Sequence, residues 1–151
     1  HDVSGVDALR DHMKTCVKTD ELESPLFVAP DEEAEKWARQ MAESFEADVA
    51  VLEKRRNIIT GAIEIHGEIP ECRNVIIVDD MISSGGTVLR AIEICKKFKA
   101  KRILVCAVHG IFSKSIAWNV DIITTNTIEN PYAQADVTPY MAKVLLKLLD
   151  F

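Results

Sequence analysis

The chain has 151 residues, with 18 basic and 24 acidic side chains and therefore a formal net charge of −6. This length fits a single domain with its own core, and contents of 48% hydrophobic and 28% charged residues exclude a disordered chain. The acidic balance argues against a nucleic acid or a membrane as partner, and no apolar run approaches the roughly 18 residues of a membrane-spanning helix.

The first predicted elements are a helix, a strand and a second helix. Ser4 or Asp7 can cap a helix whose apolar residues recur on one face as far as Val17. The short apolar run at 26–29 predicts a strand. Asp31 then provides a cap for a helix over about residues 32–45, which again has one apolar face.

The middle of the chain predicts strands on either side of a hairpin. Residues 48–53 (DVAVLE) predict a second strand, and the basic run Lys54-Arg55-Arg56 follows at its exit. Residues 57–66 alternate weakly, so we expect the segment from about 54 to 66 to be a mobile loop. The four β-branched residues VIIV at 75–78 predict the most deeply buried strand.

The rest of the chain continues the alternation of helix and strand. We predict a helix over 88–98, a strand over 102–108, a short helix over 113–118, a strand over 121–125 and a closing helix over 138–149. Because the strands are apolar on both faces, the pattern predicts an α/β fold with a mostly parallel central sheet and helices on both faces. We expect this fold to form a single domain over residues 1–151.

The four cysteines lie in or beside apolar stretches and form no C-x-x-C pair; they are Cys16, Cys72, Cys95 and Cys106. This spacing favours free thiols in a reducing cytoplasm over a metal site or a disulfide framework.

The segment VIIVDDMISSGGT, residues 75–87, carries the clearest chemical signal. Ligands bind at the carboxyl ends of parallel strands, where this strand is followed by Asp79 and Asp80. The residues that then open a helix are small or carry hydroxyls: Ser83, Ser84, Gly85, Gly86 and Thr87. Such a loop brings backbone amides, hydroxyls and a helix N-terminus to an anion, which predicts a phosphate site.

Two carboxylates would repel a phosphate, so Asp79 and Asp80 must serve another group. They can accept hydrogen bonds from sugar hydroxyls or hold Mg²⁺. The acidic pair beside the phosphate loop therefore indicates a sugar phosphate. By itself, the acidic pair is also compatible with a plain strand end, and the loop at 83–87 with a solvated turn. The occurrence of both in this order directly after a buried strand favours the ligand site.

The segment resembles the phosphoribosyl pyrophosphate motif of type I phosphoribosyltransferases and ribose-phosphate pyrophosphokinases. Four further motifs resemble the second half of the pyrophosphokinases, closest to the shorter archaeal type. They are FVAPD at 27–31, VLEKRR at 51–56, AVHGIF at 107–112 and TTNTI at 124–128. The likeness runs from about residue 26 to the end of the chain.

This resemblance implies synthesis of phosphoribosyl pyrophosphate, by transfer of the β,γ-diphosphoryl group of ATP to the 1-hydroxyl of ribose 5-phosphate. It assigns the ribose hydroxyls to Asp79 and Asp80 and the 5-phosphate to the loop at 83–87. It also implies that Lys54 and Arg56 stabilise the transferring group, which agrees with the need for charge neutralisation in phosphoryl-type transfer.

The resemblance further implies that Asp31 holds Mg²⁺ and that the family's N-terminal half, which supplies much of the ATP pocket, is not in this chain. We therefore expect a C-terminal ribose 5-phosphate-binding domain that is inactive alone. The full-length protein is expected to be cytoplasmic and to form a homo-oligomer, either a dimer or a hexamer.

Two alternatives stay open. Glu32 and Glu33 follow Asp31 where the family usually has glycines, and Trp37 stands where a basic residue often falls, which supports a non-catalytic regulatory or assembly homologue. The other alternative is a stand-alone phosphoribosyltransferase acting on a nucleobase. With an aromatic content of 6%, the chain has few side chains for a segment that stacks on a nucleobase.

Overall fold

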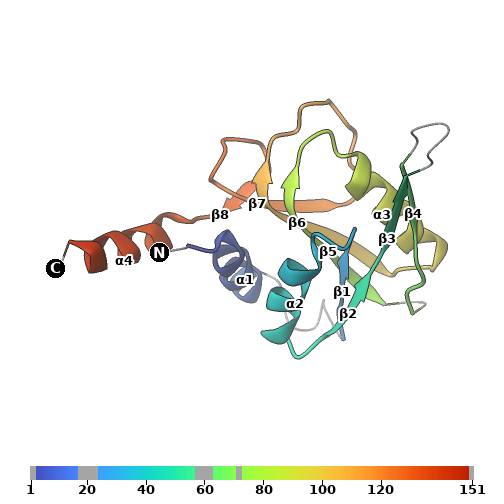
Figure 1. The fold of residues 1–151 in the computed structure, drawn as a ribbon, viewed down its shortest axis with the longest axis horizontal. Coiled ribbons are helices and arrows are strands. Elements are labelled where there is room, and N and C mark those ends of the chain that lie inside the picture. The colour runs from blue at the N-terminus through green and yellow to red at the C-terminus, as the bar shows by residue number, and fades with distance from the viewer. Residues whose placement is uncertain (1–2, 17–23, 57–62, 71–72, 150–151) are drawn as a thin grey trace.

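The computed structural model describes residues 3–16, 24–56, 63–70 and 73–149 (Figure 1). Its elements in chain order are α1 (Gly5–Cys16), β1 (Leu26–Ala29), α2 (Glu35–Glu43), β2 (Asp48–Val51), β3 (Glu53–Arg56), β4 (Ile63–His66), β5 (Asn74–Ile82), α3 (Gly86–Lys97), β6 (Arg102–Gly110), β7 (Asp121–Thr125), β8 (Ala133–Ala135) and α4 (Thr138–Leu148).

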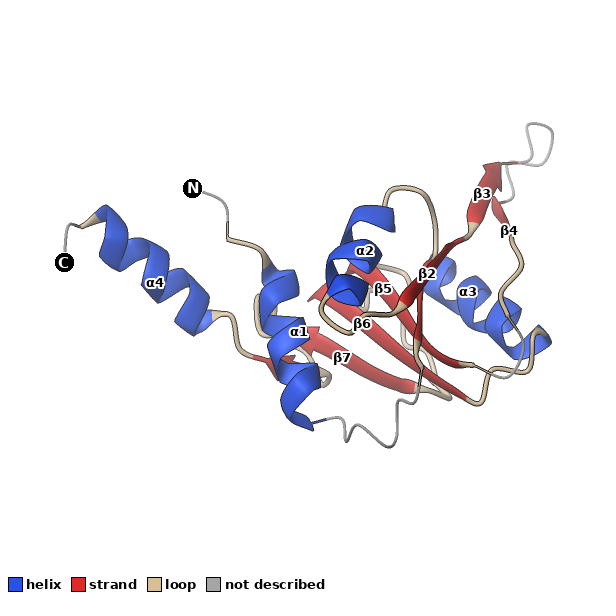
Figure 2. Cartoon of the chain, turned by 90° about the horizontal axis from the view of Figure 1, so that it is seen from below, coloured by secondary structure: helices blue, strands red, loops and turns tan. Residues whose placement is uncertain are grey.

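Six of these strands form one parallel sheet with the order β2-β1-β5-β6-β7-β8. β5 lies inside the sheet, where Val75 pairs with Leu26 of β1 and with Ile103 of β6. β3 and β4 form a separate antiparallel ribbon at one side of the molecule (Figure 2). The predicted α/β class with a mostly parallel central sheet is confirmed.

The side chains of β5 alternate between two buried faces of the sheet. Ile76 and Val78 join the apolar cluster that includes residues of α1 and α2, whereas Val75 and Ile77 join the cluster of α3. All four are essentially inaccessible to solvent. Burial on both faces is the reason that this strand reads as an unbroken run of β-branched residues.

Helices therefore cover both faces of the sheet, but α4 covers neither. It extends away from the sheet (Figure 1), and no described residue of α4 is buried. Its first turn is tied to α1, because the Tyr140 hydroxyl donates to the Asp11 carboxylate at 2.5 Å and to the Asp7 carbonyl at 3.3 Å. None of the described helices is both long and apolar enough to cross a membrane.

The predicted short helix over 113–118 is wrong, because an irregular segment joins β6 to β7. The amides of Ile111 and Phe112 donate to the Ile82 carbonyl at 2.9 and 3.2 Å, and the Ser113 amide donates to the Ser83 carbonyl at 2.9 Å. Phe112 also has a φ of +49°, outside the right-handed helical region. These bonds hold the segment against the end of β5.

Two other boundaries differ from the predictions. α2 begins at Glu35 rather than near residue 32, because the Asp31 carboxylate caps the preceding turn instead, accepting the Glu33 and Ala34 amides at 3.1 and 3.2 Å. The predicted strand over 48–53 is divided, and its last residue, Glu53, begins the ribbon. β8 was not predicted, since three residues are too few to show a strand pattern.

Candidate functional site

β5 itself carries the acidic pair at the carboxyl edge of the sheet. The strand continues through Asp79 and Asp80 to Ile82, four residues beyond the predicted end. Because neighbouring strand residues point to opposite faces, Asp79 lies on the α3 side and Asp80 on the side of α1 and α2. Asp79 is buried and Asp80 is exposed.

The environment of Asp79 favours its neutral form. Burial, followed by the negative charges of Asp80 and Asp31, raises the pKa of this carboxyl to about 7. The Asp80 amide donates to Asp79 Oδ1 at 2.9 Å, which opposes these effects in part. A ligand or cation that places positive charge or hydroxyl donors here would favour the ionised carboxylate.

Asp31 reaches the same edge from β1, the neighbour of β5. The side chain is 7% exposed, and its Oδ1 atom is fixed by the two amides that it caps. Among the described residues, no three or more side chains of the usual ligand types are arranged to hold a metal. The oxygen donors present fit Mg²⁺, which keeps several waters and takes other ligands from a phosphorylated substrate.

The predicted phosphate loop joins β5 to α3. Gly85 has a φ of +79°, a left-handed conformation that favours glycine, and its carbonyl accepts the Leu89 amide at 2.9 Å to begin the helix. Ser83, Ser84 and Gly86 are exposed and Thr87 is half-buried. The first amides of α3 have no partner within the helix and carry its partial positive charge. The loop can therefore receive an anion beside the acidic pair, as the sequence predicts.

Lys54 and Arg56 lie in β3, where their backbones pair with Ile65 and Ile63 of β4. The described part of the expected mobile loop at 54–66 is therefore an antiparallel ribbon. Residues 57–62, at its centre, lie outside the described part of the chain. The assignment of these two cations to the transferring group stays a prediction.

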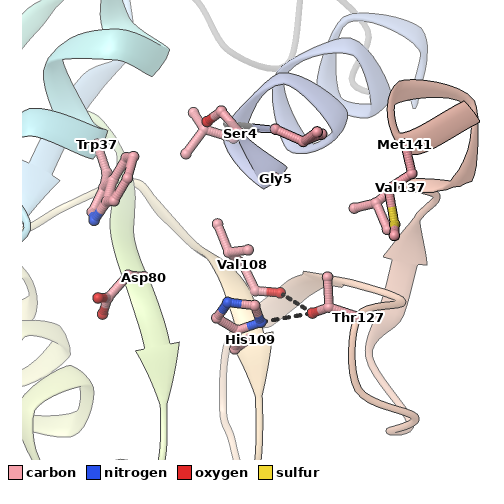
Figure 3. Close-up of a pocket in the computed structure, with 11 residues that line it drawn as sticks. Ser4, Gly5, Trp37, Asp80, Val108, His109, Thr127, Val137 and Met141 are labelled. Atoms are coloured by element: carbon pink, nitrogen blue, oxygen red, sulfur yellow. Dashed lines mark hydrogen bonds between the residues drawn. The ribbon is translucent and has the colours of Figure 1, made fainter. Parts of the chain in front are cut away.

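A cavity of about 370 Å³ opens beside Asp80, with mainly apolar walls (Figure 3). Polar atoms reach it from His109 and Thr127, whose Nδ1 and Oγ1 atoms are 2.8 Å apart, and Thr127 also donates to the Val108 carbonyl at 3.2 Å. Trp37 lines the same cavity, and its buried indole Nε1 has no hydrogen-bond partner among the described residues.

Sequence reasoning gave no role to His109, Thr127 or this cavity. Their signal is positional, because His109 lies next to the last residue of β6 and Thr127 follows β7, at the edge where β5 presents Asp80. The remaining walls come from the first turn of α1 and the start of α4. Those segments are far from the motif in sequence, so no local pattern indicates that they meet it.

Comparison with known proteins agrees with this geometry. The family model described as "Phosphoribosyl transferase domain" matches residues 4–140. Ribose-phosphate pyrophosphokinase from Thermococcus kodakarensis is 37% identical over 126 residues, covering 79% of this chain and 45% of the relative. The enzyme of that name from Mycoplasmopsis pulmonis is 37% identical over 142 residues, covering 82% and 44%. The chain spans about half the length of the curated relatives it matches.

Solved structures show the same fold. Phosphoribosylpyrophosphate synthetase from Mycobacterium smegmatis matches with a TM-score of 0.78 at 22% identity, over 97% of this chain and 51% of that chain. Adenine phosphoribosyltransferase from Saccharomyces cerevisiae matches with a TM-score of 0.63 at 22% identity, over 79% and 76%.

Proposed function

The chain belongs to the phosphoribosyl transferase domain family, and from this premise we propose that it is the ribose 5-phosphate-binding domain of a ribose-phosphate pyrophosphokinase. One observation carries the proposal. β5 and the start of α3 bring the acidic pair and the predicted phosphate loop together as one continuous unit at the carboxyl edge of the sheet. The name of the relatives that are 37% identical supports the choice of enzyme within the family.

In this proposal the two halves of the unit bind opposite ends of the sugar phosphate. The 5-phosphate accepts hydrogen bonds from loop amides and from the hydroxyls of Ser83, Ser84 and Thr87. The ribose hydroxyls donate to Asp79 and Asp80. A donor hydroxyl offsets the desolvation that raises the pKa of Asp79, so the sugar suits the carboxylate better than a bare anion does.

The reaction then joins the sugar to the diphosphoryl group of ATP. The 1-hydroxyl oxygen attacks the β-phosphorus, the bond between that phosphorus and the α,β-bridging oxygen breaks, AMP leaves with that oxygen, and the hydroxyl proton passes to solvent. Lys54 and Arg56 neutralise charge on the transferring group. Asp31 would hold Mg²⁺, which supplies further charge neutralisation when bound.

The partners follow from the same proposal. Ribose 5-phosphate binds to the described site, ATP requires the other half of a full-length enzyme, and the assembly is a homodimer or homohexamer. A cytoplasmic location is supported by the free thiols of Cys16, Cys95 and Cys106, the cysteines that the structure describes.

Calorimetry with ribose 5-phosphate tests the site directly. Asp80→Asn removes one charged acceptor of a ribose hydroxyl, and we expect it to weaken binding by about 5- to 150-fold, the equivalent of 1–3 kcal/mol. Asp80 is exposed, so the substitution should leave the fold intact. Glu93→Gln is the matched control, because it removes the same charge from an exposed position in the middle of α3.

Two results would count against the proposal. The first is a wild-type chain that shows no binding of ribose 5-phosphate at millimolar concentration. The second is Asp80→Asn binding with the affinity of Glu93→Gln, since an acidic pair that contacts the sugar must respond to the loss of one charge.

The cavity beside Asp80 favours a second candidate, a phosphoribosyltransferase acting on a nucleobase. Its walls from Val108, Val137 and Met141 are apolar, and a planar base fits such a volume. Release of pyrophosphate from phosphoribosyl pyrophosphate, assayed with each nucleobase in turn, distinguishes the candidates. Release with one base supports the second candidate, and release with none leaves the first.

A further inference from the structure

The irregular segment between β6 and β7, residues 111–120, packs directly against the phosphate loop. Its backbone is joined to the start of the loop by the amides of Ile111, Phe112 and Ser113, which donate to the Ile82 and Ser83 carbonyls. The left-handed φ of Phe112 is uncommon for a non-glycine residue and persists where surrounding structure fixes it. The segment is therefore held in one position relative to the loop.

The side chains of the segment approach the loop at Gly85. A Cβ atom added to Gly85 would lie 2.7 Å from Cη2 of Trp118 and 2.8 Å from Cδ1 of Ile116, closer than real Cβ contacts. Gly85 is thus required for its backbone conformation and also for the space that these two side chains fill. A Cβ on the neighbouring Gly86 meets only Ser84 Oγ, at 3.8 Å.

Trp118 is held in turn by other aromatic rings. Its ring lies edge-on to Phe112, with centroids 6.1 Å apart and an interplanar angle of 77°. Phe112 also packs on Tyr132, with centroids 4.8 Å apart. Both geometries are favourable for aromatic pairs. The row Trp118, Phe112 and Tyr132 therefore forms a rigid support behind a loop made of serines and glycines.

We propose that Trp118 is a positioning residue for phosphate binding, which holds the 83–87 loop in its anion-binding conformation through contact with Gly85. The inference rests on the proposed function of that loop. Small residues permit close approach of an anion but leave the backbone with many conformations to lose. A support that removes this freedom before the ligand arrives increases affinity without touching the ligand.

Removal of the support should lower the affinity for every ligand that the loop binds. We expect Trp118→Ala to lower the affinity for both ribose 5-phosphate and inorganic phosphate by about tenfold, and Trp118→Phe to restore most of the lost affinity. Asp80→Asn should lower the affinity for ribose 5-phosphate, whereas the affinity for inorganic phosphate should be unchanged or higher. Phe45→Ala is the matched control, because it removes a half-buried ring that packs on Phe27 in the apolar cluster on the other face of the sheet, and we expect a change in affinity below twofold.

A double-mutant cycle tests the contact itself. In the wild-type chain Gly85→Ala forces a methyl group against both Trp118 and Ile116, whereas in the Trp118→Ala chain only the contact with the flexible end of Ile116 remains. The further loss of affinity caused by Gly85→Ala should therefore be at least threefold smaller in the Trp118→Ala background. Gly86→Ala should cause the same loss with and without Trp118, because its Cβ does not reach the indole.

The outcomes separate this inference from the proposed function. If the wild-type chain binds neither ligand, the phosphate site is wrong and the positioning role with it. The positioning role is wrong, and the site stands, if the wild-type chain binds ribose 5-phosphate but Trp118→Ala matches Phe45→Ala for both ligands. The same holds if Gly85→Ala and Gly86→Ala show equal coupling to Trp118. Urea unfolding of each variant verifies that binding is measured on folded protein.

Discussion

Helices α3 and α4 are similar in length and in apolar content, yet they stand in opposite environments. α3 has 12 residues and buries five of them against the sheet, whereas α4 has 11 and buries none. Met141, Leu145 and Leu148 of α4 are each more than half exposed. The comparison teaches that helical periodicity identifies an apolar face but does not say what covers that face.

The two helices also differ in how they are attached. α3 follows the site loop directly and shares a core with β5, so its packing and the geometry of the loop are linked. α4 is attached at its first turn, through the bond from Tyr140 to Asp11. Substitutions in β5 and α3 should therefore affect the free energy of unfolding far more than substitutions in α4.

The largest effect is expected in the core of α3. Ile92→Ala removes three carbons from a side chain that is 5% exposed and packs in the cluster with β5, and it should lower the free energy of unfolding by about 2–5 kcal/mol. Urea unfolding followed by circular dichroism measures the change. A loss below 1 kcal/mol would mean that α3 is not packed as described.

The next effect concerns Asp79 and depends on pH. Its pKa is raised to about 7 in the folded chain, above the usual 3.8. Between pH 4 and pH 7 the carboxyl is therefore ionised in the unfolded chain but protonated in the folded chain, and the free energy of unfolding falls as the pH rises through this range. Asp79→Asn cannot ionise, and its advantage over wild type should grow by on the order of 2 kcal/mol between pH 4 and pH 8. Unfolding in urea with EDTA present measures it, with Glu93→Gln as the control that shows no such growth.

A smaller effect is expected at the attachment of α4. Tyr140→Phe removes the hydroxyl that donates to Asp11 and should lower the free energy of unfolding by about 1 kcal/mol. Burial and the bond to Asp11 raise the pKa of Tyr140 to about 12, so this contribution is complete below pH 10 and lost as the pH rises toward 12. Equal stability of wild type and variant at pH 8 would contradict the attachment.

The smallest effect is expected on the exposed side of α4. Leu145 is 55% exposed, so Leu145→Ala should change the free energy of unfolding by less than about 0.5 kcal/mol. Paired with Ile92→Ala in the same urea series, it gives the contrast between the two helices directly. A loss as large as that of Ile92→Ala would show that something covers α4 in solution.

The parts of the fold that could be predicted are those with a local cause. The strand at β1 and the strand at β7 match their predicted bounds, and α4 is one residue shorter than predicted, because each has a local apolar pattern with clear ends. The acidic pair and the loop at 83–87 lie together because they are adjacent in sequence. The helix predicted over 113–118 is wrong because residues 111–113 at its start are bound instead to the distant Ile82 and Ser83 carbonyls.

The unpredicted parts of the site depend on long-range packing. Trp118 reaches Gly85 across more than thirty residues of chain, and His109 meets Thr127 only because β6 and β7 are neighbours in the sheet. The local pattern of apolar and polar residues does not predict contacts between segments so far apart in the chain. The sequence therefore predicts candidate ligand-binding groups that are adjacent in the chain, and it gives no indication of the residues from other segments that pack beside them.

The central position of β5 also has a kinetic consequence. Its pairing with β1 joins residues that are far apart in the chain, as when Val75 meets Leu26, and contacts of this kind form slowly because a long loop must close first. The same strand ends in the acidic pair and the phosphate loop. We therefore expect the pairing of β1 with β5 to be a slow step of folding, and the acidic pair and the loop to reach their final positions only when that pairing is complete.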